Sequence, residues 1–464
     1  MTRPGVAGSR DPAGFVYQRE GQLLRQINDS YRASFERVLA SGVLDELQDA
    51  GLLIPHETAP IELAATADAW RVLRPERVGF ISYPYEWSFS QLRDAALLTL
   101  DIEARALARG MTLRDASAYN VQFHRGRPVF IDTLSVGPDG DGRPWVAYRQ
   151  FCEHFLAPLA LMARRDVRLA RLHAEFADGI PLDLTSRLLG PASWLRASLA
   201  LHVHLHARAQ SRYADAASRP KRGAAQLTRR ARLRLVEQLR QTIEAMEWEP
   251  AGTTWADYET THGYSSDAAT AKEALVRDLL SAVSPKMTWD LGANTGRFSR
   301  IAADLGSQVV AIDGDYAAVD QAYRAERARG GEAILPLVND LLSPSTSSGW
   351  ASAERQSLIE RGPADALLAL AVVHHIAFSG NIALPRIADW FAQLGRAGIV
   401  EFIPPDDPQV RRLLAARPEA THEYHREAFE RAFSRQFTIL ARRPVPETGR
   451  VLYLMRRNDA TAAA

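Results

Sequence analysis

The chain has 464 residues, which is too long for one compact core, and its 46% hydrophobic and 24% charged residues are typical of a globular protein. A formal net charge of +1 argues against a protein built as a whole to coat nucleic acid. The single cysteine, Cys152, excludes an intrachain disulfide and a multi-cysteine metal site, and its apolar neighbours predict that it is a packing residue.

The first residues, MTRPGVAGSRDPAG, contain no apolar segment of the kind found in secretory signals. No run in the sequence approaches the roughly 20 apolar residues that span a bilayer. We therefore expect a cytoplasmic protein that has no membrane among its partners.

Residues 1–209 form the first predicted domain, of α+β type, and contain one polar pattern of interest in LRDASAYNVQFHRGRPVFIDTLS. Asp115 is followed by Asn120 and, after an apolar run, by Asp132. The pattern resembles the catalytic loop of protein-kinase-like folds, in which an Asp acts as base while the Asn and a second Asp hold magnesium. The resemblance implies a nucleotide site formed by these three residues.

The sequence departs from the kinase pattern in several places. No glycine-rich loop and no clear strand lysine precede it, Leu113 stands where histidine is usual, and Thr133 and Leu134 follow Asp132 where Phe-Gly is expected. We therefore predict a degenerate kinase-like domain that binds rather than phosphorylates. The alternative is an unrelated α+β domain in which the spacing arose by chance.

Three histidines alternate in LHVHLHARAQ, and only His202 and His206 would share a helix face, with His204 on another side. Such a pair can bind a metal, but no carboxylate stands at a supporting helical position. We predict that these histidines pack in the protein and that no metal is bound.

Residues 210–249 change in composition, from small and helix-breaking residues to a basic segment with helical spacing. We interpret this segment as a linker followed by a connecting helix whose arginines face solvent. We do not expect nucleic acid as a partner.

Residues 250–457 alternate short apolar runs with helical patterns, which indicates βαβ units and a parallel sheet. The predicted strands are residues 287–292, 308–313, 333–338, 364–373 and 397–403, and helices are predicted at 296–306, 316–329 and 384–394. Residues 437–457 read as two strands joined by a turn, an antiparallel edge pair. We expect residues 458–464 to be a disordered tail.

The stretch DLGANTGRFSR, residues 290–300, joins the first of these strands to a helix. Glycine and asparagine adopt positive φ at low cost, and glycine lets a ligand approach the backbone. Asp313 ends the second strand, 23 residues after Asp290, where a carboxylate can accept hydrogen bonds from ribose hydroxyls. Asp340 follows the third strand, where it can receive an adenine amino group.

This set of residues resembles the class I S-adenosylmethionine (SAM)-dependent methyltransferases over roughly residues 255–456. The resemblance implies a Rossmann-like α/β sheet in which Gly292 and Gly296 lie along the methionine of SAM, Asp313 holds the ribose, and Asp340 with Leu341 flanks the adenine. One departure is Asn294, which replaces the usual middle glycine. The cofactor-binding residues implied are Asp290, Gly292, Asn294, Gly296, Asp313, Asp340 and Leu341.

The loop has two other interpretations. A dinucleotide-binding dehydrogenase would show G-x-G-x-x-G, whereas this loop reads G-x-N-x-G. A strand–helix turn without a ligand would require every acidic strand end to be a coincidence.

The methyl acceptor is expected over the ends of the fourth and fifth strands, where His374, His375 and Glu401 are the candidate catalytic residues. A histidine can take a proton from a hydroxyl, or it can simply shape the pocket. Enzymes that methylate nucleobase amino groups carry an Asn/Asp-Pro-Pro-aromatic motif here, so the histidines disfavour that reaction. Three aromatic residues precede the first strand and either form a lid on SAM or serve in ordinary packing: Trp255, Tyr258 and Tyr264.

The whole chain is also similar to bacterial two-part proteins described as SAM-dependent methyltransferases, some grouped with nodulation proteins. The resemblances imply O-methylation of a small molecule or glycan. The alternative is a scaffold protein that senses SAM and binds a partner or nucleotide through its kinase-like domain.

Overall fold

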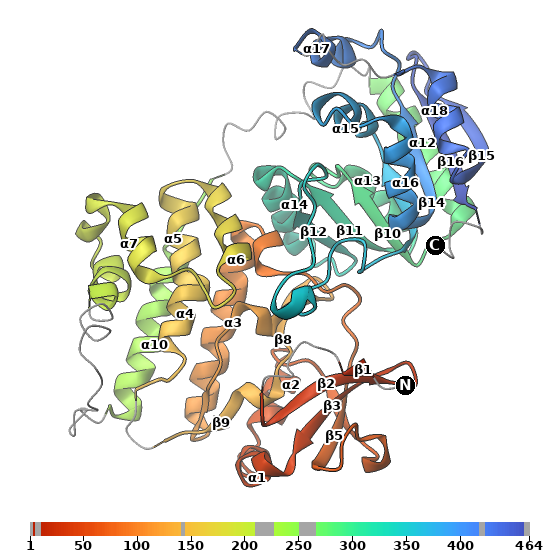
Figure 1. The fold of residues 1–464 in the computed structure, drawn as a ribbon. Helices are drawn as coiled ribbons and strands as arrows, with labels where there is room; N and C mark the ends of the chain where they lie inside the picture. Colours follow the sequence, from red (N-terminus) through yellow and green to blue (C-terminus); the bar gives the residue numbers. More distant parts are fainter. Residues whose placement is uncertain are drawn as a thin grey trace. The chain divides into compact units, whose positions relative to one another are not determined.

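The computed structural model describes residues 3–4, 11–140, 144–208, 227–249, 266–416 and 423–458. The chain forms two compact units (Figure 1). Unit 1 comprises Met1–Glu249 together with Ser348–Arg355, and unit 2 comprises Pro250–Ser347 and Gln356–Ala464.

Unit 1 begins with a five-stranded antiparallel sheet in the order β1-β2-β3-β5-β4. Its strands are β1 (Arg3–Pro4), β2 (Gly14–Arg19), β3 (Gln22–Asn28), β4 (His56–Ala59) and β5 (Ala69–Pro75). Helices α1 (Arg32–Ala40) and α2 (Val43–Asp49) lie between β3 and β4 in the chain.

The rest of unit 1 is mainly helical, and its long helix α3 (Phe89–Ala108) starts at a Ser88 cap whose side chain accepts from the Gln91 backbone. Two short strand pairs follow, β6 (Met111–Leu113) with β9 (Val136–Pro138) and β7 (Val121–His124) with β8 (Arg127–Phe130). The later helices are α4 (Tyr148–Phe151), α5 (Ala157–Arg164), α6 (Leu172–Glu175), α7 (Leu182–Leu189), α8 (Ala197–Leu199) and α10 (Arg229–Glu244), with π-helices η6 (Cys152–Leu156) and η9 (Ala200–Leu205). Cys152 is fully buried and free, as predicted.

The basic helix expected as a connector is α10, and it is a component of unit 1 packed against α3. Val236, Leu239 and Ile243 are buried on one of its faces. Arg232, also buried, forms an ion pair with Asp139. The sequence pattern thus predicted the helix, whereas its buried face and its buried arginine place it within the unit rather than in a solvated linker.

Unit 2 contains a seven-stranded sheet in the order β12-β11-β10-β13-β14-β16-β15. The strands are β10 (Met287–Leu291), β11 (Gln308–Asp313), β12 (Ile334–Val338), β13 (Ala364–Ala369), β14 (Gly395–Phe402), β15 (Phe437–Pro444) and β16 (Val451–Arg457). The first five are parallel, and β16 pairs antiparallel with both β14 and β15. This confirms the predicted α/β fold with an antiparallel pair of terminal strands at one edge.

Helices flank the sheet: α12 (Ser266–Val283), α13 (Arg297–Asp304), α14 (Tyr316–Ala328), α15 (Val373–Ser379), α16 (Leu384–Leu394), α17 (Pro408–Ala416) and α18 (Arg426–Phe433). The predicted strand 364–373 ends early, at Ala369, because Ala371 takes a left-handed conformation (φ 54°) and α15 begins at Val373. His374 therefore lies in the first turn of a helix.

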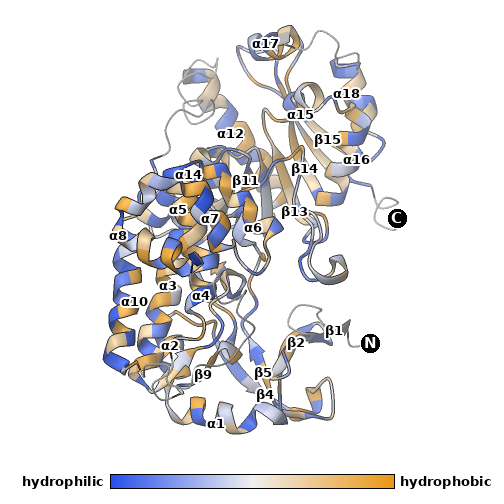
Figure 2. Cartoon of the chain, turned by 60° about the vertical axis from the view of Figure 1, so that its left-hand side comes forward, coloured by the Kyte–Doolittle hydropathy of each residue, from blue (hydrophilic) through white to orange (hydrophobic). Residues whose placement is uncertain are grey.

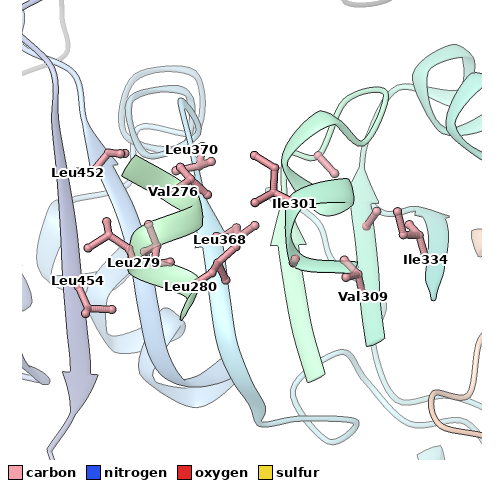
Figure 3. Close-up of a cluster of buried hydrophobic side chains, with 14 of the residues drawn as sticks. Val276, Leu279, Leu280, Ile301, Val309, Ile334, Leu368, Leu370, Leu452 and Leu454 are labelled. Carbon is pink, nitrogen blue, oxygen red and sulfur yellow. The ribbon is translucent and has the colours of Figure 1, made fainter. Parts of the chain in front are cut away.

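The core of unit 2 includes a cluster in which α12 side chains pack on the sheet (Figure 3). Val276, Leu279 and Leu280 of α12 meet Leu368 of β13 and Leu454 of β16. Every residue of β14 except Arg396 is buried, and the central strands are predominantly apolar (Figure 2). None of the helices in the described ranges has the length and apolarity that crossing a bilayer requires.

Candidate functional site

The loop after β10 has the backbone conformation that its sequence predicts. Gly292, Asn294 and Gly296 all have positive φ, at 73°, 50° and 86°. A Cβ atom on Gly292 would lie 3.0 Å from a methyl carbon of Val372, so a side chain there would be strained by both backbone and neighbour. Gly296 is the N-cap of α13. The loop thus presents backbone rather than side chains at the point where β10 ends.

Asp313, at the end of β11, is tied directly to this loop. One carboxylate oxygen accepts the Asn294 backbone N–H at 2.8 Å, and the other accepts that of Asp315 at 2.9 Å. Burial raises the pKa of Asp313, and the backbone donors oppose that rise. The Gly314 backbone N–H also acts on this carboxylate, so at least one of the four lone-pair positions of its two oxygens remains for a ligand hydroxyl.

Asp290 is buried and holds α13 against β10. Its carboxylate accepts a hydrogen bond from Ser299 Oγ at 2.6 Å. Burial raises the pKa of Asp290 to about 6, and the nearby Asp313 charge acts in the same direction. The geometry gives Asp290 a supporting role beneath the loop, and its contact with a cofactor stays a prediction.

Asp340 follows β12 at the same edge of the sheet. Its carboxylate accepts the Leu342 backbone N–H at 2.9 Å, which forms a tight turn around Leu341. A Cβ on Gly314 would lie 3.8 Å from the Asp340 Cα, so Asp340 lies close to the segment that follows Asp313. The strand ends bring the predicted ribose and adenine residues together.

His374 is buried, and neither of its ring nitrogens has a hydrogen-bond partner among the residues that the structure describes. Its ring lies 4.2 Å from that of His375, centroid to centroid. Burial holds the pKa of His374 well below its ordinary range, and the charges of Arg450 and Lys272 also lower it. Burial lowers the pKa of His375 to about 4. Both imidazoles are therefore neutral at pH 7, and His374 is left with unsatisfied polar atoms that a bound group can satisfy.

Glu401 is fully buried at the end of β14, where it accepts a hydrogen bond from Lys272 Nζ at 2.7 Å. Lys272 comes from α12 and lies 4.9 Å from the centroid of the Phe298 ring. The ion pair gives Glu401 a partner inside the protein, and whether it holds an acceptor or caps the loop before Pro404 stays a prediction. Sequence reasoning missed Lys272, since nothing local marks a lysine that pairs with a carboxylate 129 positions away.

The three aromatic residues that precede the first strand, Trp255, Tyr258 and Tyr264, lie outside the described residues. Their role stays a prediction.

In unit 1 the three polar residues of the kinase-like pattern converge. The Asp115 carboxylate interacts with the side chains of Asn120 and Gln150, and Asn120 Nδ2 donates to Ser135 Oγ at 3.3 Å. Ser135 Oγ in turn donates to Asp132. Burial raises the pKa of Asp115, and the Asp132 charge acts in the same direction.

Two arginines that the sequence pattern did not reveal complete this cluster. Arg25 of β3 forms an ion pair with Asp132. Arg114, directly before Asp115, donates to the Tyr31 hydroxyl at 2.7 Å. A strand cation, Arg25, is therefore present at the cluster, in place of the strand lysine that the kinase pattern would have.

The alternating histidines of η9 are engaged within unit 1. His202 Nδ1 lies 2.7 Å from the Tyr148 hydroxyl, and His206 stacks on the same ring. The two nitrogens of His204 lie 2.6 and 2.8 Å from the hydroxyls of Ser186 and Ser193. These contacts confirm the prediction that the histidines pack. Across the ranges that the structure covers, no group of three or more His, Cys, Asp or Glu residues is arranged to hold a metal.

Comparison with known proteins gives one relative that matches the whole length. Over 469 residues, 98% of this chain and 97% of the relative, the sequence is 34% identical to the nodulation protein NoeA of Rhizobium meliloti (strain 1021). No family model matches the chain.

Among solved structures, the N-methyltransferase NodS from Bradyrhizobium japonicum WM9, in complex with S-adenosyl-L-homocysteine, matches 45% of this chain and 100% of its own at 14% identity, with a TM-score of 0.33. The bifunctional kinase-methyltransferase WbdD matches 47% of this chain and 45% of its own at 16% identity, with a TM-score of 0.31. Likenesses this low carry no argument, and the fold assignment depends on the strand order. The comparisons do not confirm the kinase-like interpretation of residues 1–209, which stays a prediction.

Proposed function

The chain belongs to the family of the nodulation protein NoeA, and from this premise and the geometry of unit 2 we propose that it is a SAM-dependent methyltransferase acting on a hydroxyl of a small molecule or glycan. The observation that carries the proposal is the loop at the end of β10, where three left-handed residues and the Asp313 carboxylate meet. It lies at the carboxyl ends of the central parallel strands, where open α/β sheets bind ligands.

The residues present fit SAM. Gly292 is only partly buried and has no side chain, the Asp313 carboxylate retains a lone pair for a ribose hydroxyl, and Asp340 stands at the next strand end. When bound, SAM supplies a methyl group activated on a sulfonium. The chain's own contribution is to position the acceptor, since such a displacement depends mainly on alignment.

His374 is the residue that we assign to the acceptor. A buried imidazole with two unsatisfied nitrogens gains most from a ligand that both donates and accepts hydrogen bonds, and a hydroxyl does both. A pKa held well below the ordinary range makes this imidazole a weak base, so its role toward the acceptor is to form hydrogen bonds that orient the hydroxyl. Lys272 and Arg450 lower its pKa, and each of these cations is paired with a carboxylate, Glu401 and Asp407 respectively.

Calorimetry with SAM and with its demethylated product tests the cofactor. Loss of Asp313 in an Asp313→Ala variant removes charge-assisted bonds to the ribose, which should weaken SAM binding by about 2 to 3 kcal/mol. Circular dichroism checks that the variant is folded. No heat with either ligand at millimolar concentration, or an unchanged dissociation constant in the folded variant, would contradict the proposal.

The alternative is a scaffold protein that senses SAM without transferring its methyl group. Incubation with methyl-labelled SAM and a cell extract separates the two functions. Label transferred to any fraction, and lost with Asp313→Ala, supports the enzyme. SAM binding without any transfer supports the sensor.

A second candidate function concerns unit 1, where we propose a weak magnesium–nucleotide site at Asp115, Asn120 and Asp132. The convergence of these side chains supports it. The Asn120 amide hydrogens are used by Asp115 and Ser135, so the amide oxygen remains for a metal, and carboxylate and amide oxygens suit Mg²⁺. Arg25 must then leave Asp132 or turn to the nucleotide phosphates.

A thermal-shift series with ATP, with and without Mg²⁺, tests this site. We expect a metal-dependent rise in melting temperature that Asp132→Ala abolishes, with no phosphoryl transfer. A flat response at saturating nucleotide would leave unit 1 as a structural or partner-binding domain.

A further inference from the structure

One helical segment of unit 1 buries polar side chains and exposes apolar ones, the reverse of an ordinary surface helix. Along α8 and η9, His202, Val203 and His204 are buried, whereas Leu201 and Leu205 are each 49% exposed. The two leucines are four positions apart, so they lie on one face of the helix. The buried histidines are satisfied by hydroxyl groups of neighbouring helices. The leucines therefore face solvent because the polar side of this helix is used for packing.

The segment just before this helix extends the apolar face. Leu195, at the end of the short helix Pro191–Leu195, is 91% exposed. The adjacent Trp194 stacks on His204 with ring centroids 4.4 Å apart, and the Arg208 guanidinium lies 4.3 Å from the centroid of the Trp194 ring. Since His204 belongs to η9, these contacts hold the segment of Trp194 and Leu195 against the same helix that exposes Leu201 and Leu205. We call Trp194, Leu195, Leu201 and Leu205 the leucine face.

The surroundings of the leucine face are cationic. No acidic residue occurs in the sequence between Asp183 and Asp215. Arg196 follows Leu195 directly, and its charge lowers the pKa of Arg164 in addition to the effect of burial, so these two guanidinium groups are near neighbours. Helix α7, which packs against η9, adds Arg187, but that charge is compensated by Asp183 at 2.8 Å. Glu247 also acts on Arg164, in the opposite direction, so the excess of positive charge beside the leucines depends on Arg196.

We propose that the leucine face binds the headgroup region of an anionic lipid bilayer. Segments that bind a membrane surface without spanning it typically contain tryptophan and leucine flanked by arginines. Their apolar side chains enter the interface, and their cations contact lipid phosphates. Arginine side chains are long enough to reach phosphates while their stems remain in the apolar layer. The expectation of no membrane partner came from the absence of a spanning run, and binding to a surface requires none.

The charge pattern favours this occupant over two others. A second copy of the chain docked on the same face would bring arginines against arginines, which opposes association. An acidic protein helix would have to match leucines that project from a convex helix face, whereas a fluid bilayer adapts to them.

Sedimentation of the full-length protein with vesicles tests the proposal. We expect binding to vesicles of equal parts phosphatidylcholine and phosphatidylglycerol, weakened by salt, and at least tenfold weaker binding to phosphatidylcholine alone. Leu201→Ser with Leu205→Ser should reduce binding to the mixed vesicles by about tenfold or more. Arg196→Gln should reduce it by a smaller factor and flatten the salt dependence.

The matched control is Leu305→Ser with Leu440→Ser, which changes two leucines of similar exposure, 40% and 47%, in unit 2. It should bind as the wild type does, and thermal melting should show that all variants are folded. Absence of binding at low salt, equal binding to both kinds of vesicle, or a Leu201/Leu205 variant that binds like the wild type would overturn the proposal. The proposal would also be overturned if the protein did not bind vesicles and formed a dimer in analytical ultracentrifugation that only the Leu201/Leu205 variant disrupted.

Discussion

Glu103 provides a quantitative test of how burial controls charge in unit 1. It lies on α3 with no exposed surface, and its carboxyl group accepts hydrogen bonds from the Leu113 backbone at 2.6 Å and from Thr112 Oγ1 at 3.0 Å. It thus fixes β6, the strand that leads to Asp115. Burial raises the pKa of Glu103 from its ordinary 4.5 to about 8, against the effect of its hydrogen-bond donors.

This shift fixes the sign of the pH dependence. In the unfolded chain the carboxyl group loses its proton near pH 4.5, whereas in the folded chain it keeps it up to about pH 8. The folded state therefore binds one more proton between these values, and the free energy of unfolding falls as pH rises. The contribution is complete below pH 4.5 and lost as pH passes 8. The slope is about 1.4 kcal/mol per pH unit, or about 3 kcal/mol from about pH 5.5 to about pH 7.5.

Glu103→Gln removes the titration while keeping an oxygen that accepts the same hydrogen bonds. The difference in melting temperature between the variant and the wild type should increase in favour of the variant by on the order of 5 to 10 °C between about pH 5.5 and about pH 7.5. Scanning calorimetry at several pH values measures it, with Glu244→Gln, on the exposed side of α10, as control. Parallel curves for wild type and Glu103→Gln would show that the carboxyl group is ionised in the fold, and the burial argument would be refuted.

Two further changes test unit 2. Gly292→Ala adds a Cβ atom at a residue with φ 73°, and this atom would lie 3.0 Å from Val372. The affinity for SAM should therefore fall by about tenfold or more, while the circular dichroism spectrum stays unchanged. Equal affinity of variant and wild type in calorimetry would mean that this backbone does not approach the ligand. Lys272→Met leaves Glu401 charged and buried without its partner, which should cost about 3 to 5 kcal/mol in a urea titration, whereas the double variant with Glu401→Leu should recover most of the loss. A double variant no more stable than the single one would count against a charge effect.

The parts of the fold that local patterns specify could be predicted from the sequence. Each parallel strand of unit 2 is a short apolar run followed by helical spacing. In the loop from Gly292 to Gly296, the glycine and asparagine residues predict the left-handed conformations. Strand 364–373 was predicted too long because an alanine, Ala371, takes a left-handed conformation that its residue type does not suggest.

What could not be predicted depends on pairing across the chain. Lys272 and Glu401 are 129 positions apart, and Arg25 and Asp132 are 107 apart, so no spacing rule connects them. The direction in which a helix faces was equally hidden. The basic pattern of α10 suggested solvation, but tertiary packing buried Arg232 against Asp139.

Unit 1 is assembled from two pieces of chain, and this has a consequence for biosynthesis. Ser348–Arg355 belongs to unit 1, where the Arg355 guanidinium lies 5.0 Å from the centroid of the Tyr119 ring, beside Asn120. On the ribosome this piece is translated only after β10, β11 and β12 of the other unit. Unit 1, which begins first, is therefore completed only at Arg355, when Pro250–Ser347 of unit 2 has already been translated, and unit 2 is completed after it. A polypeptide that ended after Glu249 would lack Arg355, and nascent unit 1 lacks its contact with the Tyr119 ring until that residue is translated.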